Sequence, residues 1–213
     1  MKQRNWISTF LSVVRSQIVK PLARKVTALF RSSSTDVAVS EEREPVSLIQ
    51  WVPTPLEIVR KMLEIAQVSP KDIIYDLGCG DARVLIMAVK EFGAKKAVGY
   101  EIRQDLYDGS MKEIKSQNLQ NRVTLIKGDL LGADLSEASV ITMYLSTTAN
   151  ETVRPKLESE VKPSTRIVSH DFSMKTWQEE STESCSTATL YLYRVPQAFQ
   201  NRSADNTTEA QYP

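Results

Sequence analysis

The chain has 213 residues, of which 41% are hydrophobic and 25% are charged, a composition typical of a soluble globular protein. Its formal net charge is +1, but residues 1–31 carry seven basic and no acidic side chains, which leaves −6 for the remainder. A net negative charge on residues 32–213 does not favour binding to nucleic acid, which is itself negatively charged. Two cysteines, no CxxC motif and a single histidine exclude a disulfide framework and the usual zinc sites, so we predict no metal.

The amino-terminal segment, residues 1–31, contains a predicted amphipathic helix over residues 6–30. Apolar side chains recur there at steps of three and four residues: Trp6, Phe10, Val13, Val14, Ile18, Leu22, Val26 and Leu29. Three interpretations stay open, in which the helix packs on its own domain or a partner, anchors the chain to a membrane surface, or targets it to another compartment. We expect a cytoplasmic protein, free or membrane-associated, with a mitochondrial location as the alternative. No run of about 18 apolar residues predicts a transmembrane helix.

Three further segments follow. Residues 32–47 are polar and acidic and are predicted to be a linker. Residues 48–196 alternate between apolar strands and amphipathic helices and are predicted to be the folded domain, which we expect to be a monomer. Residues 197–213 are polar and non-periodic, so we expect a disordered tail.

Within the domain, predicted strands and predicted helices take turns along the chain. We expect helices at residues 55–66, 81–92, 104–117 and 149–160. We expect strands at residues 73–77, 96–101, 123–126, 140–145, 165–169 and 188–193. Helical connections of this length predict an α/β fold with a Rossmann-like, doubly wound and mostly parallel sheet. Right-handed crossovers then place a ligand at the carboxyl ends of the strands.

A glycine-rich turn follows the first predicted strand. The stretch begins with Asp76 and places Gly78 and Gly80 where the chain leaves the strand, so that the backbone can approach a ligand closely. Dinucleotide binding would prefer a third glycine three residues after Gly80, but Arg83 stands there. The Gly-Lys-Ser/Thr of a phosphate loop is also absent, so the turn by itself indicates neither a dinucleotide site nor a phosphate loop.

Acidic side chains stand at the ends of the next two predicted strands. Glu101 ends the second strand, where a carboxylate can accept hydrogen bonds from both ribose hydroxyls of a nucleoside. Asp129 follows the third strand, where it can accept a hydrogen bond from an adenine amino group. A single acidic strand end is usually just solvated, but three of them in register with a glycine turn predict a nucleoside site.

This motif set resembles that of class I S-adenosylmethionine-dependent methyltransferases. The segments WVPTP from Trp51, DLGCGDAR, AVGYEIR, GDL, MYL and RIVSHDF together are similar to archaeal broad-specificity protein-lysine methyltransferases and to their mitochondrial relatives, over roughly residues 48–194. The resemblance implies an enzyme that transfers a methyl group from S-adenosylmethionine to the side-chain amine of lysine, with proteins bearing exposed lysines as partners. It implies cofactor binding by Asp76, Gly78, Gly80, Glu101, Asp129 and Tyr144.

The acceptor side of such a site would need an apolar, aromatic channel. Trp51, Thr54 and Tyr144 are the candidate catalytic residues, with Tyr144 also counted among the cofactor contacts. Phe172 and Trp177 are further candidates for the channel, although we assign Phe172 to the core. We expect the single histidine, His170, to cap the fifth strand by bonding to the backbone, since amine methylation needs little base catalysis.

Two positions depart from the family pattern. Ala82 and Ser164 stand where the family usually has glycine, and we expect Ala82 to crowd the carboxylate end of the cofactor. This departure supports one alternative, a membrane-tethered module that binds S-adenosylmethionine without turnover. The other alternative is a methyltransferase acting on a small molecule or RNA. Against it, Met143-Tyr144-Leu145-Ser146 replaces the Asn/Asp-Pro-Pro-Tyr/Phe motif of many nucleic-acid amino methylases.

Overall fold

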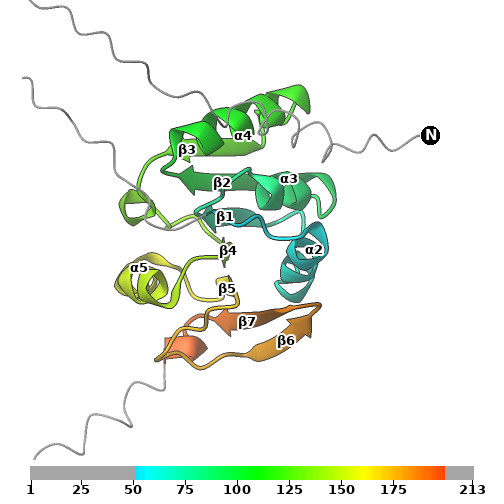
Figure 1. Cartoon of the computed structure of the whole chain (residues 1–213). Helices are drawn as coiled ribbons and strands as arrows, with labels where there is room; N and C mark the ends of the chain where they lie inside the picture. Colours follow the sequence, from blue (N-terminus) through cyan, green and yellow to red (C-terminus); the bar gives the residue numbers. More distant parts are fainter. Residues whose placement is uncertain (1–50, 200–213) are drawn as a thin grey trace, which may run out of the picture. The chain divides into compact units, whose positions relative to one another are not determined.

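Seven strands form one sheet in the computed structural model, which describes residues 51–199 (Figure 1). Their order is β3-β2-β1-β4-β5-β7-β6. The strands are β1 Ile73–Leu77, β2 Lys96–Glu101, β3 Val123–Lys127, β4 Val140–Met143, β5 Arg166–His170, β6 Ser181–Cys185 and β7 Ala188–Arg194. Strands β1 to β5 are parallel, and β7 runs antiparallel to both β5 and β6. The predicted α/β, doubly wound and mostly parallel sheet is therefore confirmed.

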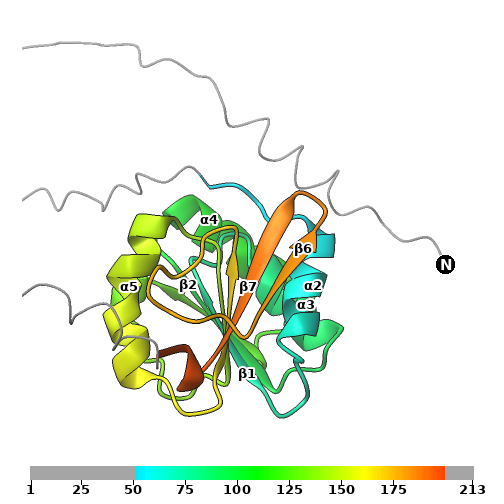
Figure 2. The same cartoon turned by 90° about the horizontal axis from the view of Figure 1, so that it is seen from below.

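Helices cover both faces of this sheet (Figure 2). On one face lie α2 Leu56–Ile65, α3 Arg83–Lys90 and α4 Gln104–Ser116, and on the other lies α5 Thr147–Glu160. Successive strand residues point to opposite faces, so Ile74 and Ala97 pack with α2 and α3, whereas Tyr75 and Val98 pack in the cluster that contains α5. Apolar strands buried on both faces explain why the sequence has near-continuous apolar runs there. A short 3-10 helix, η1 Leu130–Gly132, follows β3.

A buried ion pair fixes the amino ends of the strands. Arg166 at the start of β5 pairs with Asp72 just before β1, and it donates to the backbone carbonyl of Ala66 at 2.7 Å. The hydroxyls of Ser69 and Ser139 each donate to Asp72 at 2.8 Å. Burial raises the pKa of Asp72, but these hydrogen bonds and Arg166 outweigh it and hold the pKa below its usual value. Because β1 and β5 are fixed at this end, their carboxyl ends are held in place on the opposite edge.

Some predicted boundaries differ from the structure. Strand β6 was not predicted, because its alternating residues are at most half-buried and polar, and it pairs only along its β7 side. The packed part of the chain also extends beyond the predicted boundary at residue 196. Ala198 is buried, and the ring of Phe199 lies 4.7 Å from that of Trp177. The predicted helix at 1–31, the linker at 32–47 and the tail from residue 200 lie outside the described residues.

Candidate active site

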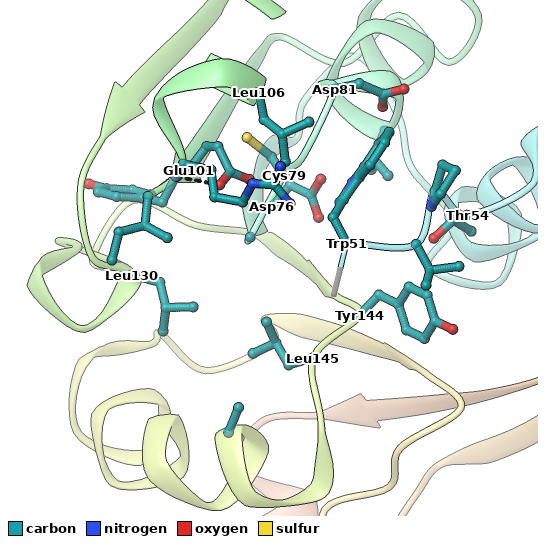
Figure 3. Close-up of a pocket in the computed structure, with 18 of the residues that line it drawn as sticks. Trp51, Thr54, Asp76, Cys79, Asp81, Glu101, Leu106, Leu130, Tyr144 and Leu145 are labelled. Atoms are coloured by element: carbon teal, nitrogen blue, oxygen red, sulfur yellow. Dashed lines mark hydrogen bonds between the residues drawn. The ribbon is translucent and has the colours of Figure 1, made fainter. Parts of the chain in front are cut away.

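A cavity of about 390 Å³ opens at the carboxyl ends of β1, β2 and β4, the edge predicted to hold a ligand. Its wall includes every predicted site residue except Gly80, which lies in the same turn under Trp51. Figure 3 shows Trp51, Thr54 and Tyr144 together on one side of the pocket, and Glu101 with Leu130 on the other. The lining is apolar between these groups, with Val84, Ile102, Leu106, Leu130, Leu145 and Ala149. This combination suits a ligand of drug-like size with a few oriented polar groups.

The turn after β1 needs glycine at two positions for different reasons. Gly78 has φ of 83°, and its amide donates to the carbonyl of Tyr100 at 3.1 Å. Gly80 has φ of 55°, and a Cβ atom there would lie 2.3 Å from Nε1 of Trp51. Glycine therefore lets the backbone turn in the left-handed region and lets the indole of Trp51 lie against it. The segment before α2 is thus packed directly over the predicted cofactor turn.

Ala82 adopts φ of 63° and is fully buried in the core cluster on the α2 and α3 face. It does not line the pocket, so its methyl group does not take space from a ligand there. The left-handed backbone at this position explains why glycine suits it, and an alanine in this conformation costs about 1 kcal/mol. Ser164, the other departure, also has positive φ, at 72°. The expected crowding of the ligand by Ala82 is therefore not observed.

Four carboxylates face the pocket: Asp76, Asp81, Glu101 and Asp129. Glu101 is 5% exposed, and its two oxygens accept hydrogen bonds from the amides of Gly80 at 2.9 Å and Arg103 at 2.8 Å. Each oxygen has a second acceptor site, so the carboxylate can still accept from a ligand. Asp129 uses one oxygen to cap η1 through the amide of Leu131 at 2.9 Å and has its second oxygen as a further acceptor. Arg83 and Arg103 also line the pocket, so its wall carries four acidic and two basic side chains and a net negative charge, which favours a ligand that carries positive charge.

Asp76 is as deeply buried as Glu101, at 5% exposure. Burial raises its pKa to about 7, the nearby charges of Asp81 and Glu101 act in the same direction, and a hydrogen bond from the Thr142 hydroxyl at 2.7 Å opposes them. A carboxyl group in a ligand pocket whose pKa lies near pH 7 is typical of a functional site. A cationic ligand group beside it would favour the ionised form.

An ion pair in the turn holds the segment that precedes α2. Arg83 pairs with Asp81 through two contacts, one of them at 2.8 Å, and its guanidinium also donates to the backbone carbonyl of Thr54 at 2.7 Å. Both charged groups are largely buried. This ion pair was not predicted, although an acid and an arginine two residues apart after a glycine turn are a sequence signal for it.

The predicted acceptor side is brought together by residues far apart in the chain. Trp51, Thr54, Tyr144 and Phe172 all line the pocket, and the rings of Tyr144 and Phe172 lie 6.2 Å apart. The assignment of Phe172 to the core was therefore wrong. Trp177 does not line the pocket, because its ring packs against Tyr193 and Phe199, and its Nε1 donates to Glu158 at 3.0 Å.

His170 was expected to bond to the backbone, but its ring nitrogens face side chains. Nδ1 lies 3.3 Å from the hydroxyl of Thr54, and Nε2 lies 3.3 Å from a carboxylate oxygen of Asp171. Its ring stacks on Tyr144 with centroids 3.8 Å apart. Nothing local in the sequence indicates these contacts, since Thr54 lies 116 residues away.

Comparisons with known proteins agree with this geometry. Residues 76–181 match the family model of the ANTKMT methyltransferase domain. A protein-lysine N-methyltransferase of Saccharolobus islandicus is 45% identical over 151 residues, which cover 69% of this chain and 94% of that protein. The adenine nucleotide translocase lysine N-methyltransferase of Mus musculus is 25% identical, over 72% of this chain and 66% of that protein. The chain belongs to the class I S-adenosylmethionine-dependent methyltransferases, and to the family of the S. islandicus enzyme.

A solved structure resembles this methyltransferase closely. The RNA methyltransferase of Salinibacter ruber, in complex with S-adenosyl-L-homocysteine, is 41% identical and superimposes with a TM-score of 0.66. The match covers 68% of this chain and 95% of that one. The cofactor of this methyltransferase is accordingly S-adenosylmethionine. The pocket fits this cofactor, which carries a sulfonium and an ammonium group. Asp76, whose pKa is about 7, and the other carboxylates of the pocket can face these positive charges.

Proposed function

We propose that this methyltransferase transfers the methyl group of S-adenosylmethionine to the side-chain amine of lysine in proteins. The observation that carries the proposal is the 45% identity to a protein-lysine N-methyltransferase across 94% of that protein. The pocket supports it, because Trp51, Tyr144 and Phe172 give its acceptor end aromatic faces that can hold an amine. The charge of the chain also supports the proposal. The residues after position 31 carry a net charge of −6, which attracts lysine-rich segments of a protein substrate.

The pocket residues divide into two groups in this proposal. Gly78 and Gly80 let the backbone approach the cofactor, Asp76 faces its ammonium group, Glu101 accepts from the ribose hydroxyls and Asp129 accepts from the adenine amine. Trp51, Thr54 and Tyr144 surround the acceptor, and Tyr144 also borders the cofactor. Bound S-adenosylmethionine supplies an electrophilic methyl group.

The remaining task of the protein is to position the amine and to remove its proton. The free pKa of lysine is about 10.4, but an apolar, aromatic channel disfavours the charged form and so lowers that pKa. An amine held neutral there would be able to take the methyl group that bound S-adenosylmethionine supplies, leaving S-adenosylhomocysteine, and the one proton that the ammonium form loses would go to solvent. Positioning and desolvation account for most of the rate in such a displacement.

Two finer proposals concern the chain outside the pocket. We propose that residues 1–31 bind an anionic membrane surface, because seven basic and no acidic side chains accompany the apolar pattern, with mitochondrial targeting as the alternative. No helix within residues 51–199 is long and apolar enough to cross a membrane. We also propose that the enzyme acts as a monomer.

RNA is the second candidate acceptor, because the S. ruber relative is described as an RNA methyltransferase. The two candidates are separated by incubating the full chain with cell extract and methyl-labelled cofactor, then digesting aliquots with protease or with ribonuclease. We expect label that becomes acid-soluble with protease and is unaffected by ribonuclease. Loss of label with ribonuclease would favour RNA, and absence of any label would favour a binding module without turnover.

Asp76 predicts a pH dependence of cofactor binding. Its pKa of about 7 means that the carboxyl group is mostly protonated below that pH, and only the ionised form attracts the ammonium group. Affinity is therefore expected to rise by roughly tenfold as the pH increases from 5.5 to 7, the direction that follows from ligand-linked proton release. Calorimetric titration at several pH values measures this.

The matched variant for this test is Asp76→Asn, which keeps the shape and the contact with Thr142. It should bind the cofactor weakly at every pH, with the pH dependence lost. A wild-type affinity that stays flat across this range, or an Asp76→Asn variant that retains the slope, would show that Asp76 does not face the cation.

A further inference from the structure

His170 lies behind the acceptor end of the pocket and joins three separate parts of the fold. It is the last residue of β5, is 3% exposed, and does not line the pocket. Its partners are Thr54 in the segment before α2, Tyr144 after β4 and Asp171 in the turn after β5. The first two of these line the pocket. His170 therefore contacts two residues of the pocket wall without lining the pocket itself.

Asp171 places a carboxylate beside the imidazole. Its backbone has φ of 60°, its amide donates to the carbonyl of Thr189 at 2.7 Å, and its Oδ1 accepts from the amide of Thr189 at 2.9 Å. The other carboxylate oxygen is thereby held 3.3 Å from Nε2 of His170. The negative charge beside Nε2 favours the tautomer with its proton on that nitrogen, which leaves Nδ1 as an acceptor. Burial lowers the pKa of His170, Asp171 opposes the shift, and the net lowering favours the neutral ring.

The Nδ1 atom then determines where the Thr54 hydroxyl points. That hydroxyl lies 3.3 Å away and can donate to it. The carbonyl of the same residue is held by Arg83, so Thr54 is fixed from both its backbone and its side chain. The face of the His170 ring supports the Tyr144 ring in a stack with an interplanar angle of 29°.

We propose that His170 is a positioning residue for methyl transfer, which holds Thr54 and Tyr144 in the arrangement that receives the acceptor amine. This inference rests on the proposed function for the identity of the acceptor. It assigns to the single histidine of the chain a role in aligning the acceptor, with no proton transfer to or from the substrate. Misplacement of reacting groups by about 1 Å can reduce a rate by about a hundredfold, so loss of this support should be visible in turnover.

Two substitutions separate the contacts of His170. His170→Phe keeps a ring to stack on Tyr144 but removes both ring nitrogens, whereas His170→Asn keeps an acceptor toward Thr54 but removes the ring. Thr54→Val removes the hydroxyl at nearly constant shape. Its matched control is Thr165→Val, which removes another buried hydroxyl, bonded to the carbonyl of Ala138 at 3.1 Å at the far end of the sheet.

We expect His170→Phe and Thr54→Val each to lower kcat by on the order of tenfold to a hundredfold. Cofactor Kd should change less than about twofold, and Thr165→Val should keep kcat. Because the two residues act through one contact, the double variant should be about as slow as the slower single variant. His170→Asn should recover part of the loss if the contact with Thr54 dominates. Wild-type kcat in His170→Phe, or effects that multiply in the double variant, would overturn the proposal.

Imidazole nitrogen NMR tests the same contact without any acceptor, because the chain has one histidine. At pH 7 the full-length protein should show a neutral ring with its proton on Nε2. The Nδ1 resonance should shift in Thr54→Val and stay unchanged in Thr165→Val. A proton on Nδ1, or an Nδ1 resonance whose chemical shift is unchanged in Thr54→Val, would overturn the role of His170 even if the proposed lysine activity held. Failure of the wild type to modify lysine would instead contradict the proposed function and leave this NMR result to decide the role of His170.

Discussion

Replacing Glu101 by alanine is expected to weaken S-adenosylmethionine binding by about 30-fold or more, equivalent to about 2 kcal/mol. Each oxygen of this carboxylate already accepts from one backbone amide, at 2.9 Å from Gly80 and 2.8 Å from Arg103, and each has one acceptor site left. Two ribose hydroxyls can fill these sites. Isothermal titration with the cofactor measures the loss directly.

The matched variant is Glu101→Gln, which keeps the shape and one acceptor oxygen. We expect it to bind more weakly than the wild type but more tightly than the alanine variant, since charged hydrogen bonds become neutral ones. Because Glu101 also holds the amide of Gly80, melting curves of both variants are needed to separate loss of the turn from loss of the ribose contact. Unchanged affinity in a well-folded alanine variant would contradict the placement of the cofactor.

Replacing Tyr144 by alanine is expected to reduce kcat by about a hundredfold while cofactor Kd changes far less. Tyr144 follows β4, lines the pocket, and stacks on His170 at 3.8 Å and beside Phe172 at 6.2 Å. Its removal deletes the central ring of this aromatic group at the acceptor end. Steady-state kinetics on a protein that the enzyme methylates gives kcat, and cofactor titration gives Kd.

Tyr144→Phe provides the control for this variant because it preserves the ring and removes only the hydroxyl. If the aromatic face holds the amine, the phenylalanine variant should keep most of the activity. If Tyr144→Ala lost cofactor affinity as strongly as turnover, Tyr144 would be assigned to cofactor binding instead of acceptor binding. Loss of turnover in Tyr144→Phe equal to that of alanine would assign the role to the hydroxyl.

The central strands and the grouping of the strand-end carboxylates around one pocket were predictable from the sequence. Strands β1 and β2 have the predicted bounds, because apolar runs that end at Gly78 and Glu101 mark buried parallel strands clearly. The carboxyl ends of parallel strands lie on one edge, so the positions of Asp76, Glu101 and Asp129 along the chain already place them together.

The proposed acceptor side of the pocket was less predictable because its contacts are not local. His170 acquires its environment from Thr54 and Tyr144, and neither is indicated by any spacing around it. Phe172 and Trp177 are both aromatic residues after β5, yet Phe172 lines the pocket and Trp177 packs on Tyr193. Their separation depends on the course of the loop between β5 and β6, which residue type and periodicity do not specify.

Tandem mass spectrometry of the modified product tests the central claim most directly. Full-length enzyme and its Glu101→Ala variant are incubated with cell extract and isotopically labelled S-adenosylmethionine, and the extract proteins are digested to peptides. Labelled methyl groups should appear on lysine side chains of several unrelated proteins, and the variant should show strongly reduced labelling at the same lysines. Labelled methyl groups confined to RNA, to small molecules or to residues other than lysine would contradict the proposed function.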